Sequence, residues 1–103
     1  MLYDVFYWLR NYGQTNLDNI RKNFPDIKIN VVTDFYEEDA HNTCERYSET
    51  DKYFFITPDT YIHSTFTGFD KEYDDENTHL WAKCIPNSSD EREYHGLGLY
   101  HKK

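Results

Sequence analysis

Glycine is scarce in this sequence, with only four glycines among 103 residues. Neither GxGxxG nor the P-loop pattern (GxxxxGKS or GxxxxGKT) occurs. These are the glycine-rich loops that hold the phosphates of dinucleotides and of nucleoside triphosphates. The sequence therefore argues against a Rossmann dinucleotide cradle and against a P-loop.

Cysteines and long apolar runs are also few. Cys44 and Cys84 are the two cysteines, and no CxxC pattern joins them, which favours a reduced intracellular pair over a disulfide. The longest unbroken apolar run, Val5 to Leu9, is far too short to span a membrane. No basic-then-apolar signal segment opens the sequence. We therefore expect a cytoplasmic protein.

Basic residues are outnumbered, since eleven Lys and Arg stand against nineteen Asp and Glu and leave a net charge of −8. A basic footprint for nucleic acid and a polybasic stretch for an anionic membrane are both missing, so neither partner is expected. The acidic run at 70–76 does not match an EF-hand, because Asp75 stands where that loop requires glycine. A solvated acidic loop is the simpler interpretation.

Aromatic residues are abundant, with ten Tyr, seven Phe and two Trp. Leu, Ile, Val and Phe together make up 22 of 103 residues, which is little apolar material for a chain with this net charge. The aromatic rings supply the missing apolar area. We expect one folded domain, over residues 1–103, with an aromatic core.

Strands and helices alternate along the first sixty residues. Short runs rich in aromatic and β-branched residues predict strands, and apolar stripes at helical spacing predict helices. We predict strands at 2–9, 27–32 and 53–56, helices at 15–24 and 37–48, a loop at 63–77 anchored by Phe66 and Phe69, and short strands at 79–85 and 94–100. Thr15 with Asp18 forms a capping signal for the first helix, and Pro25 ends it.

This order predicts an α/β fold: a three-layer, Rossmann-like sheet with β-α-β-α-β followed by two further short strands. Ligands of such sheets bind beyond the carboxyl ends of the strands, where the strand order reverses. The segments expected there are 9–13, 33–36 and 57–61.

The exit of the third predicted strand reads FITPDTY at 55–61 and resembles the DxD region of GT-A nucleotide-diphospho-sugar glycosyltransferases. The rest of the chain is similar in order to small glycosyltransferase-like domains of large phages and other viruses. The similar stretches are YDVFY, NFP, AHNTCERYSETDKYFFITPDT, THLWAK and YHGLGLYHKK. The resemblance implies a GT-A-like domain that binds a nucleotide-sugar, in the host cytosol or associated with a virion.

The resemblance also implies a divalent metal, Mn²⁺ or Mg²⁺, held against the donor diphosphate by carboxylates at alternate positions. Here Asp59 is the single candidate metal ligand, because Thr57 and Tyr61 occupy the flanking alternate positions. A hydroxyl is a poor replacement for a charged ligand, so the departure weakens the case for catalysis. Thr57 and Tyr61 remain candidates for contact with the donor.

Four further residues are candidates for donor binding. Arg10 follows the first strand and suits a diphosphate, while Asp34 ends the second and suits a base or ribose, or else caps the next helix. His79 and Trp81 share one face of a strand and match an HxW feature of the resembled family. A histidine near Asp59 would complete a metal site, although a structural histidine packed beside the tryptophan is the alternative. Gly96 and Gly98 leave one strand face bare, for a ligand or for packing.

Three functional hypotheses remain open at this point. The first is a nucleotide-sugar-dependent glycosyltransferase whose catalytic base is unknown. The second is a non-catalytic relative, truncated or degenerate, that acts as a homo-oligomer or within a viral assembly; the short chain and the missing carboxylates favour it. The third is an acidic DNA mimic that inhibits a nucleic-acid-binding enzyme, which the charge of −8 favours.

Overall fold

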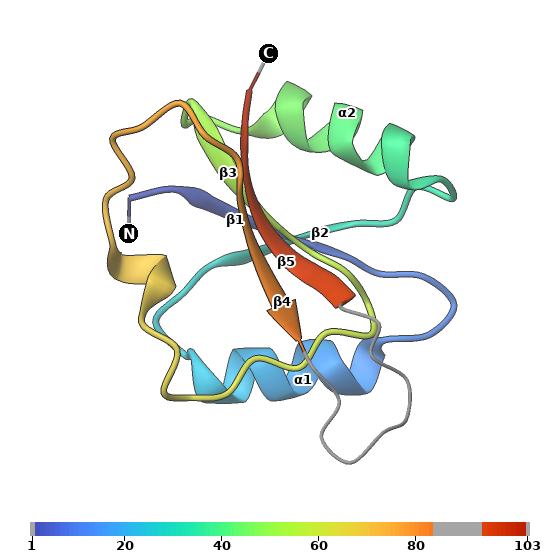
Figure 1. Ribbon diagram of the computed structural model, residues 1–103. Helices are drawn as coiled ribbons and strands as arrows, with labels where there is room; N and C mark the ends of the chain where they lie inside the picture. The colour runs from blue at the N-terminus through green and yellow to red at the C-terminus, as the bar shows by residue number, and fades with distance from the viewer. Residues whose placement is uncertain (1, 84–93, 103) are drawn as a thin grey trace.

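Strands and helices alternate in the computed structural model, which describes residues 2–83 and 94–102 (Figure 1). The elements are β1 (Asp4–Trp8), α1 (Gln14–Asn23), β2 (Ile29–Val32), α2 (Glu37–Tyr47), β3 (Lys52–Ile56), the 3₁₀ turn η1 (Gly68–Asp70), β4 (His79–Lys83) and β5 (Tyr94–His101). This order confirms the predicted α/β fold, with boundaries shifted by a few residues. No described helix is both long enough and apolar enough to cross a bilayer.

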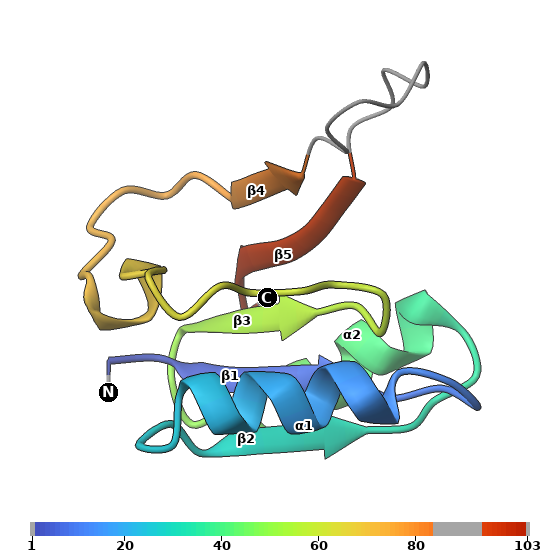
Figure 2. The same ribbon diagram turned by 90° about the horizontal axis from the view of Figure 1, so that it is seen from below.

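The strands form one sheet in the order β2-β1-β3-β5-β4. β1 pairs in parallel with both β2 and β3, as expected for strands joined through helices. β5 pairs antiparallel with β3 and with β4, so this hairpin extends the parallel part of the sheet (Figure 2). The chain passes from β1 to β2 on one side and then returns to β3 on the other. The strand order therefore reverses between β1 and β3.

The two helices lie on opposite faces of the sheet and bury alternate residues of the same strands (Figure 1). Val5 and Tyr7 of β1 belong to the cluster that contains Leu17 and Ile20 of α1. Their neighbours Phe6 and Trp8 belong to the cluster that contains Ala40 and Cys44 of α2. A strand covered on both faces has no polar side to present to water, which explains the continuous apolar run in β1.

The loop between β3 and β4 is anchored by aromatic side chains, as predicted. Phe69 is only 1% exposed and packs edge-on against Phe54, with ring centroids 5.0 Å apart. Phe66 packs against Phe69 in the same way, at 5.1 Å. The buried Lys52 also holds this loop, because its ammonium donates to the backbone carbonyls of Tyr73 and Asp75.

Two of the predicted helix caps are wrong. Gln14 begins α1, and the residue before it is Gly13, whose φ of 102° is accessible mainly to glycine. Thr15 is therefore already inside the helix. Tyr36, not Asp34, is the residue that caps α2, and neither helix has a side-chain cap hydrogen bond. Cys44 is buried and free, while Cys84 lies outside the described residues.

Candidate functional site

The loops after β1 and β3 meet at the carboxyl edge of the sheet, where the strand order reverses. This is the position at which open α/β sheets bind ligands. The loop after β2 joins them, because the Trp8 indole N–H donates to the Asp34 carbonyl at 2.7 Å and the Leu9 N–H donates to the Val32 carbonyl at 2.9 Å. The three predicted loop segments therefore lie at one edge.

The buried Tyr7 side chain joins two of these loops. Its hydroxyl lies 2.8 Å from the Gly13 carbonyl and 3.0 Å from the Pro58 carbonyl, so one proton is shared between two acceptors. Asn16 of α1 also donates to the Pro58 carbonyl, at 2.9 Å. Burial, with the nearby Asp59 charge as a second cause, raises the pKa of Tyr7 to about 12. The phenol therefore stays protonated and keeps donating well above neutral pH.

Asp59 lies on a hollow of about 270 Å³ at this reversal point. The hollow is lined by Trp8, Tyr12, Glu37, Thr57, Pro58, Asp59 and Gly96. The Asp59 side chain is exposed, and its Oδ1 accepts a hydrogen bond from the Thr57 hydroxyl at 2.9 Å. The Thr57 hydroxyl thus orients the carboxylate instead of adding a second charge beside it.

Gly96 of β5 is packed against the turn that carries Asp59. Its carbonyl accepts from the Thr57 N–H at 2.9 Å and from the Thr60 hydroxyl at 2.9 Å. A Cβ atom at residue 96 would lie only 1.9 Å from the Thr60 Oγ1, so the close approach requires glycine. At Gly98 the neighbouring Tyr100 ring covers the same space, with an atom 2.5 Å from the Cβ position. Both glycines are therefore explained by packing within the chain.

Arg10 lies on a second hollow, of about 360 Å³, lined by Leu9, Arg10, Asn11, Thr33 and Phe35. Its guanidinium carbon is 4.9 Å from the Trp8 ring centroid and 4.9 Å from that of Phe35. Arg10 is thus held over two aromatic rings at the same edge as Asp59. Such cation–π contacts fix the guanidinium while leaving it able to donate to an anion.

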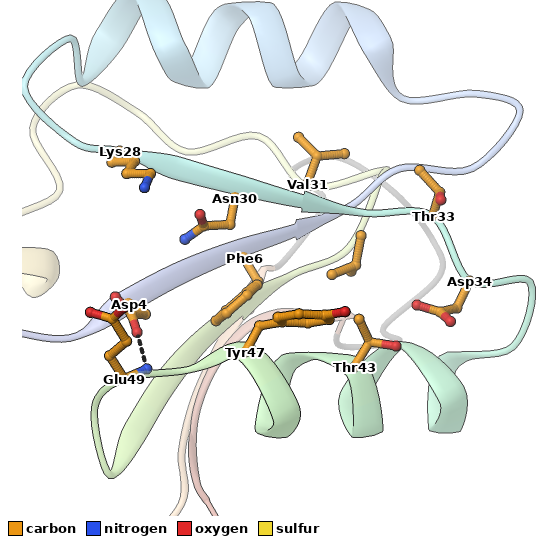
Figure 3. Close-up of a pocket in the computed structure, with 11 residues that line it drawn as sticks. Asp4, Phe6, Lys28, Asn30, Val31, Thr33, Asp34, Thr43, Tyr47 and Glu49 are labelled. Carbon is orange, nitrogen blue, oxygen red and sulfur yellow. Dashed lines mark hydrogen bonds between the residues drawn. The ribbon is translucent and has the colours of Figure 1, made fainter.

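Asp34 lies at one end of a groove of about 620 Å³ between β2 and α2 (Figure 3). Thr43 and Tyr47 of α2 face Asn30 of β2 across this groove. At the far end the Asp4 carboxylate accepts from the Glu49 N–H at 2.7 Å. Asp34 and Asp59 lie at the same edge of the sheet but line different hollows. Trp8 connects the two, because its indole donates to the Asp34 carbonyl and its side chain lines the Asp59 hollow.

The structure does not bring His79 and Trp81 to Asp59. β4 is separated from β3 by β5, and His79 pairs with Leu99, which on its other side pairs with Phe54 in the middle of β3. The Nε2 of His79 lies 2.8 Å from Oδ1 of Asp75, a hydrogen bond that is the main cause of the lowered pKa of Asp75. His79 therefore does not complete a metal site with Asp59, because β4 is separated from β3 by β5 and the His79 ring is paired with Asp75.

Trp81 and Tyr61 do not line the Asp59 or Arg10 hollows either. Trp81 is half-buried and packs against Phe66, with centroids 5.6 Å apart, and against Phe54, at 5.9 Å. Tyr61 is 47% exposed beside the carboxyl-edge turn. Trp81 thus belongs to the aromatic core on the α1 face. This is the structural role predicted from the sequence as the alternative to ligand binding for His79 and Trp81.

The residues at the carboxyl edge fit a divalent cation only if the phosphates of a bound molecule supply most of the coordinating oxygens. Within residues 2–83 and 94–102, no group of three His, Cys, Asp or Glu side chains could hold a metal. Asp59 and Glu37 are the two carboxylates of the Asp59 hollow. One or two carboxylates together with substrate phosphates form a common Mg²⁺ site, whereas a site made by protein alone needs more ligands.

Four residues of the Asp59 hollow were not identified as site residues from the sequence: Trp8, Tyr12, Glu37 and Pro58. Trp8 ends β1 and could have been found as the last side chain of a strand that leads into the edge. Glu37 is an acidic residue in the first turn of a helix. The favourable interaction of such an acid with the helix dipole explains this pattern without any binding role.

No protein-family model matches the sequence, and no curated protein matches it. A search of solved structures finds the crystal structure of a glycosyltransferase involved in the glycosylation of the major capsid of PBCV-1. The TM-score is 0.51 and the sequence identity is 10%, over 96% of this chain. The likeness therefore shows a glycosyltransferase-like fold. The chain spans only 60% of the length of that protein.

Proposed function

We propose that this chain is a glycosyltransferase-like domain that binds a nucleotide-sugar at the carboxyl edge of its sheet. The observation that carries the proposal is the Asp59 hollow, which lies at the strand-order reversal between β1 and β3. The likeness in fold to a viral glycosyltransferase supports it.

In this proposal the donor lies across Trp8, between the Arg10 hollow and the Asp59 hollow. Arg10 donates to the diphosphate, because a guanidinium presents paired N–H groups to phosphate oxygens. Asp34 accepts hydrogen bonds from the hydroxyls of the nucleoside. The Thr57 hydroxyl holds the Asp59 carboxylate in place, at 2.9 Å.

Charge explains why a divalent cation belongs in the proposal. The residues lining the Asp59 and Arg10 hollows include two acids, Glu37 and Asp59, and one base, Arg10. A diphosphate placed there meets a net negative surface, and partial burial strengthens the repulsion. Mn²⁺ or Mg²⁺ bound by Asp59 and the diphosphate would neutralise this charge and stabilise the leaving nucleoside diphosphate.

Calorimetry with nucleoside diphosphates and nucleotide-sugars tests donor binding, in the presence and absence of Mn²⁺. We expect binding that depends on Mn²⁺, and loss of that dependence in Asp59→Asn. The matched control is Asp26→Asn, because Asp26 is also exposed but lies in the turn between α1 and β2, at the amino edge. Absence of binding to every nucleotide, or equal weakening by both variants, would contradict the proposal.

A donor-binding module without transferase activity is the second candidate. The observation that favours it is the single carboxylate at the exit of β3, where Thr57 and Tyr61 replace the flanking acids. Incubation of the chain with each bound nucleotide-sugar separates the two candidates. Release of nucleoside diphosphate that Asp59→Asn abolishes indicates an enzyme, whereas stable binding without turnover indicates a module.

A further inference from the structure

Exposed aromatic rings gather at the carboxyl edge, beside the proposed donor site. Tyr12 follows β1 and is 56% exposed, while Phe35 and Tyr36 follow β2 and are 69% and 65% exposed. We call these three side chains the aromatic rim. Large exposed rings cost solvation free energy, and a group of them beside a hollow commonly marks a binding surface.

A chain of contacts links the rim to both hollows. The rings of Phe35 and Tyr36 pack edge to face, with centroids 4.9 Å apart. Phe35 covers the Arg10 guanidinium, which also covers Trp8, and Trp8 lines the Asp59 hollow together with Tyr12. The rim therefore follows the outer border of the proposed donor site.

The chemistry of this border favours a neutral, polyhydroxylated ligand. Acidic residues follow the rim along the chain, at Glu37, Glu38 and Asp39 in the first turn of α2. These carboxylates repel nucleic acid and other anions, but they accept hydrogen bonds from hydroxyl groups. Aromatic faces carry partial negative charge and attract the polarised C–H groups that cover one face of a pyranose ring.

We propose that the aromatic rim binds the pyranose rings of an acceptor glycan. The proposal rests on the proposed function, because an acceptor must lie against the sugar of the bound donor. Phe35 and Tyr36 form the stacking surface, and Glu37 accepts hydrogen bonds from the sugar hydroxyls. A neutral glycan is thus the substrate class that this edge recognises.

Saturation-transfer NMR tests the proposal with millimolar methyl glycosides of common neutral hexoses and pentoses, without nucleotide. We expect saturation of ring C–H protons in at least one glycoside, and apparent affinity about tenfold weaker in Tyr36→Ala. The matched control is Tyr47→Ala, since Tyr47 is 66% exposed at the other end of α2. It should bind the glycoside as the natural sequence does.

A second variant keeps the test specific for a ring face. Tyr36→Leu preserves an apolar side chain but removes the aromatic face, so it should lose glycoside binding as fully as Tyr36→Ala. No saturation of any glycoside, or equal weakening by Tyr47→Ala, would overturn the proposal. So would concentration-dependent dimerisation that Tyr36→Ala abolishes but Tyr36→Leu preserves, because a second copy of the chain would then be the ligand.

The calorimetric experiment on nucleotides distinguishes failure of the rim from failure of the donor site. Nucleotide binding without glycoside binding would remove the acceptor proposal and leave the donor proposal intact. Glycoside binding without nucleotide binding would leave a carbohydrate-binding surface on a chain that does not use a nucleotide donor.

Discussion

Replacing Tyr7 with Phe tests whether one buried hydroxyl holds the two loops of the candidate site together. The side chain is fully buried, and its hydroxyl is shared between the carbonyls of Gly13 and Pro58. Each carbonyl has another donor: Leu17 N–H at 3.0 Å for Gly13 and Asn16 Nδ2 at 2.9 Å for Pro58. Tyr7→Phe therefore leaves no carbonyl without a partner.

The expected loss of stability follows from the hydrogen bonds that these two carbonyls keep. A buried hydrogen bond contributes about 1 kcal/mol net, and the larger penalty for an orphaned group does not apply here. We expect Tyr7→Phe to lower the free energy of unfolding by about 1 kcal/mol. For a chain of this size, that corresponds to a fall in Tm of about 4 °C.

Urea denaturation followed by circular dichroism measures the effect. The midpoint should fall while the slope m stays unchanged, because the surface exposed on unfolding is the same. Tyr47→Phe is the matched control, since Tyr47 is exposed, and its midpoint should not move. Donor binding should weaken in Tyr7→Phe, because the loops that carry Arg10 and Asp59 lose a connection.

Two results would refute this reasoning. An unchanged midpoint would mean that the hydroxyl contributes nothing beyond the ring. A loss greater than about 3 kcal/mol would mean that a carbonyl is left without any partner. Either result would remove the argument that Tyr7 positions the site.

Two further predictions concern the same loops and the same core. Gly13→Ala should destabilise the chain by about 1–3 kcal/mol, because residue 13 has φ of 102° and an added Cβ would lie 2.6 Å from the Pro58 Cβ; an unchanged urea midpoint would contradict this. Stability should also fall with rising pH above the ordinary thiol value of 9.0, since burial raises the pKa of Cys44 to about 12 and that of Tyr7 to about 12. Below pH 9.0 the thiol and the phenol are protonated in both the folded and the unfolded chain, and the full stability is present. Between pH 9.0 and about 12 these groups ionise first in the unfolded chain, so unfolding becomes easier. Urea midpoints measured across this range should fall, and a pH-independent midpoint would be inconsistent with the buried phenol and thiol.

The sequence was a good guide where a local pattern had one structural solution. The apolar run in β1 and the helical stripe that includes Leu17 and Ile20 predicted a strand and a helix, and both are confirmed. The structure adds that the two pack on each other. The order of elements then favoured parallel pairing, because strands joined through helices pair that way. Placing Asp59 at the exit of an interior strand needed no further information.

Helix starts and long-range placement were less predictable. Thr15 with Asp18 has the side chains of a capping motif, but Gly13 takes the cap position in a left-handed conformation and Gln14 begins α1. Asp34 has the side chain of a cap, but its carbonyl accepts from Trp8 and Tyr36 takes the cap position. The backbone conformation and its hydrogen bonds determine where α1 and α2 begin. The pattern of side chains in the sequence does not show where the backbone carbonyls lie.

The sequence by itself determined the alternation of strands and helices and the acidic character of the chain, because both are properties of neighbouring residues. Only the tertiary structure decided which side chains meet at the carboxyl edge. His79 was separated from Asp59 by the place of β4 beyond β5 in the sheet, and Trp8, Glu37 and Gly96 were brought to Asp59 by packing between segments far apart in the sequence. Strand direction and packing are set by the whole sheet, so no local pattern contains them.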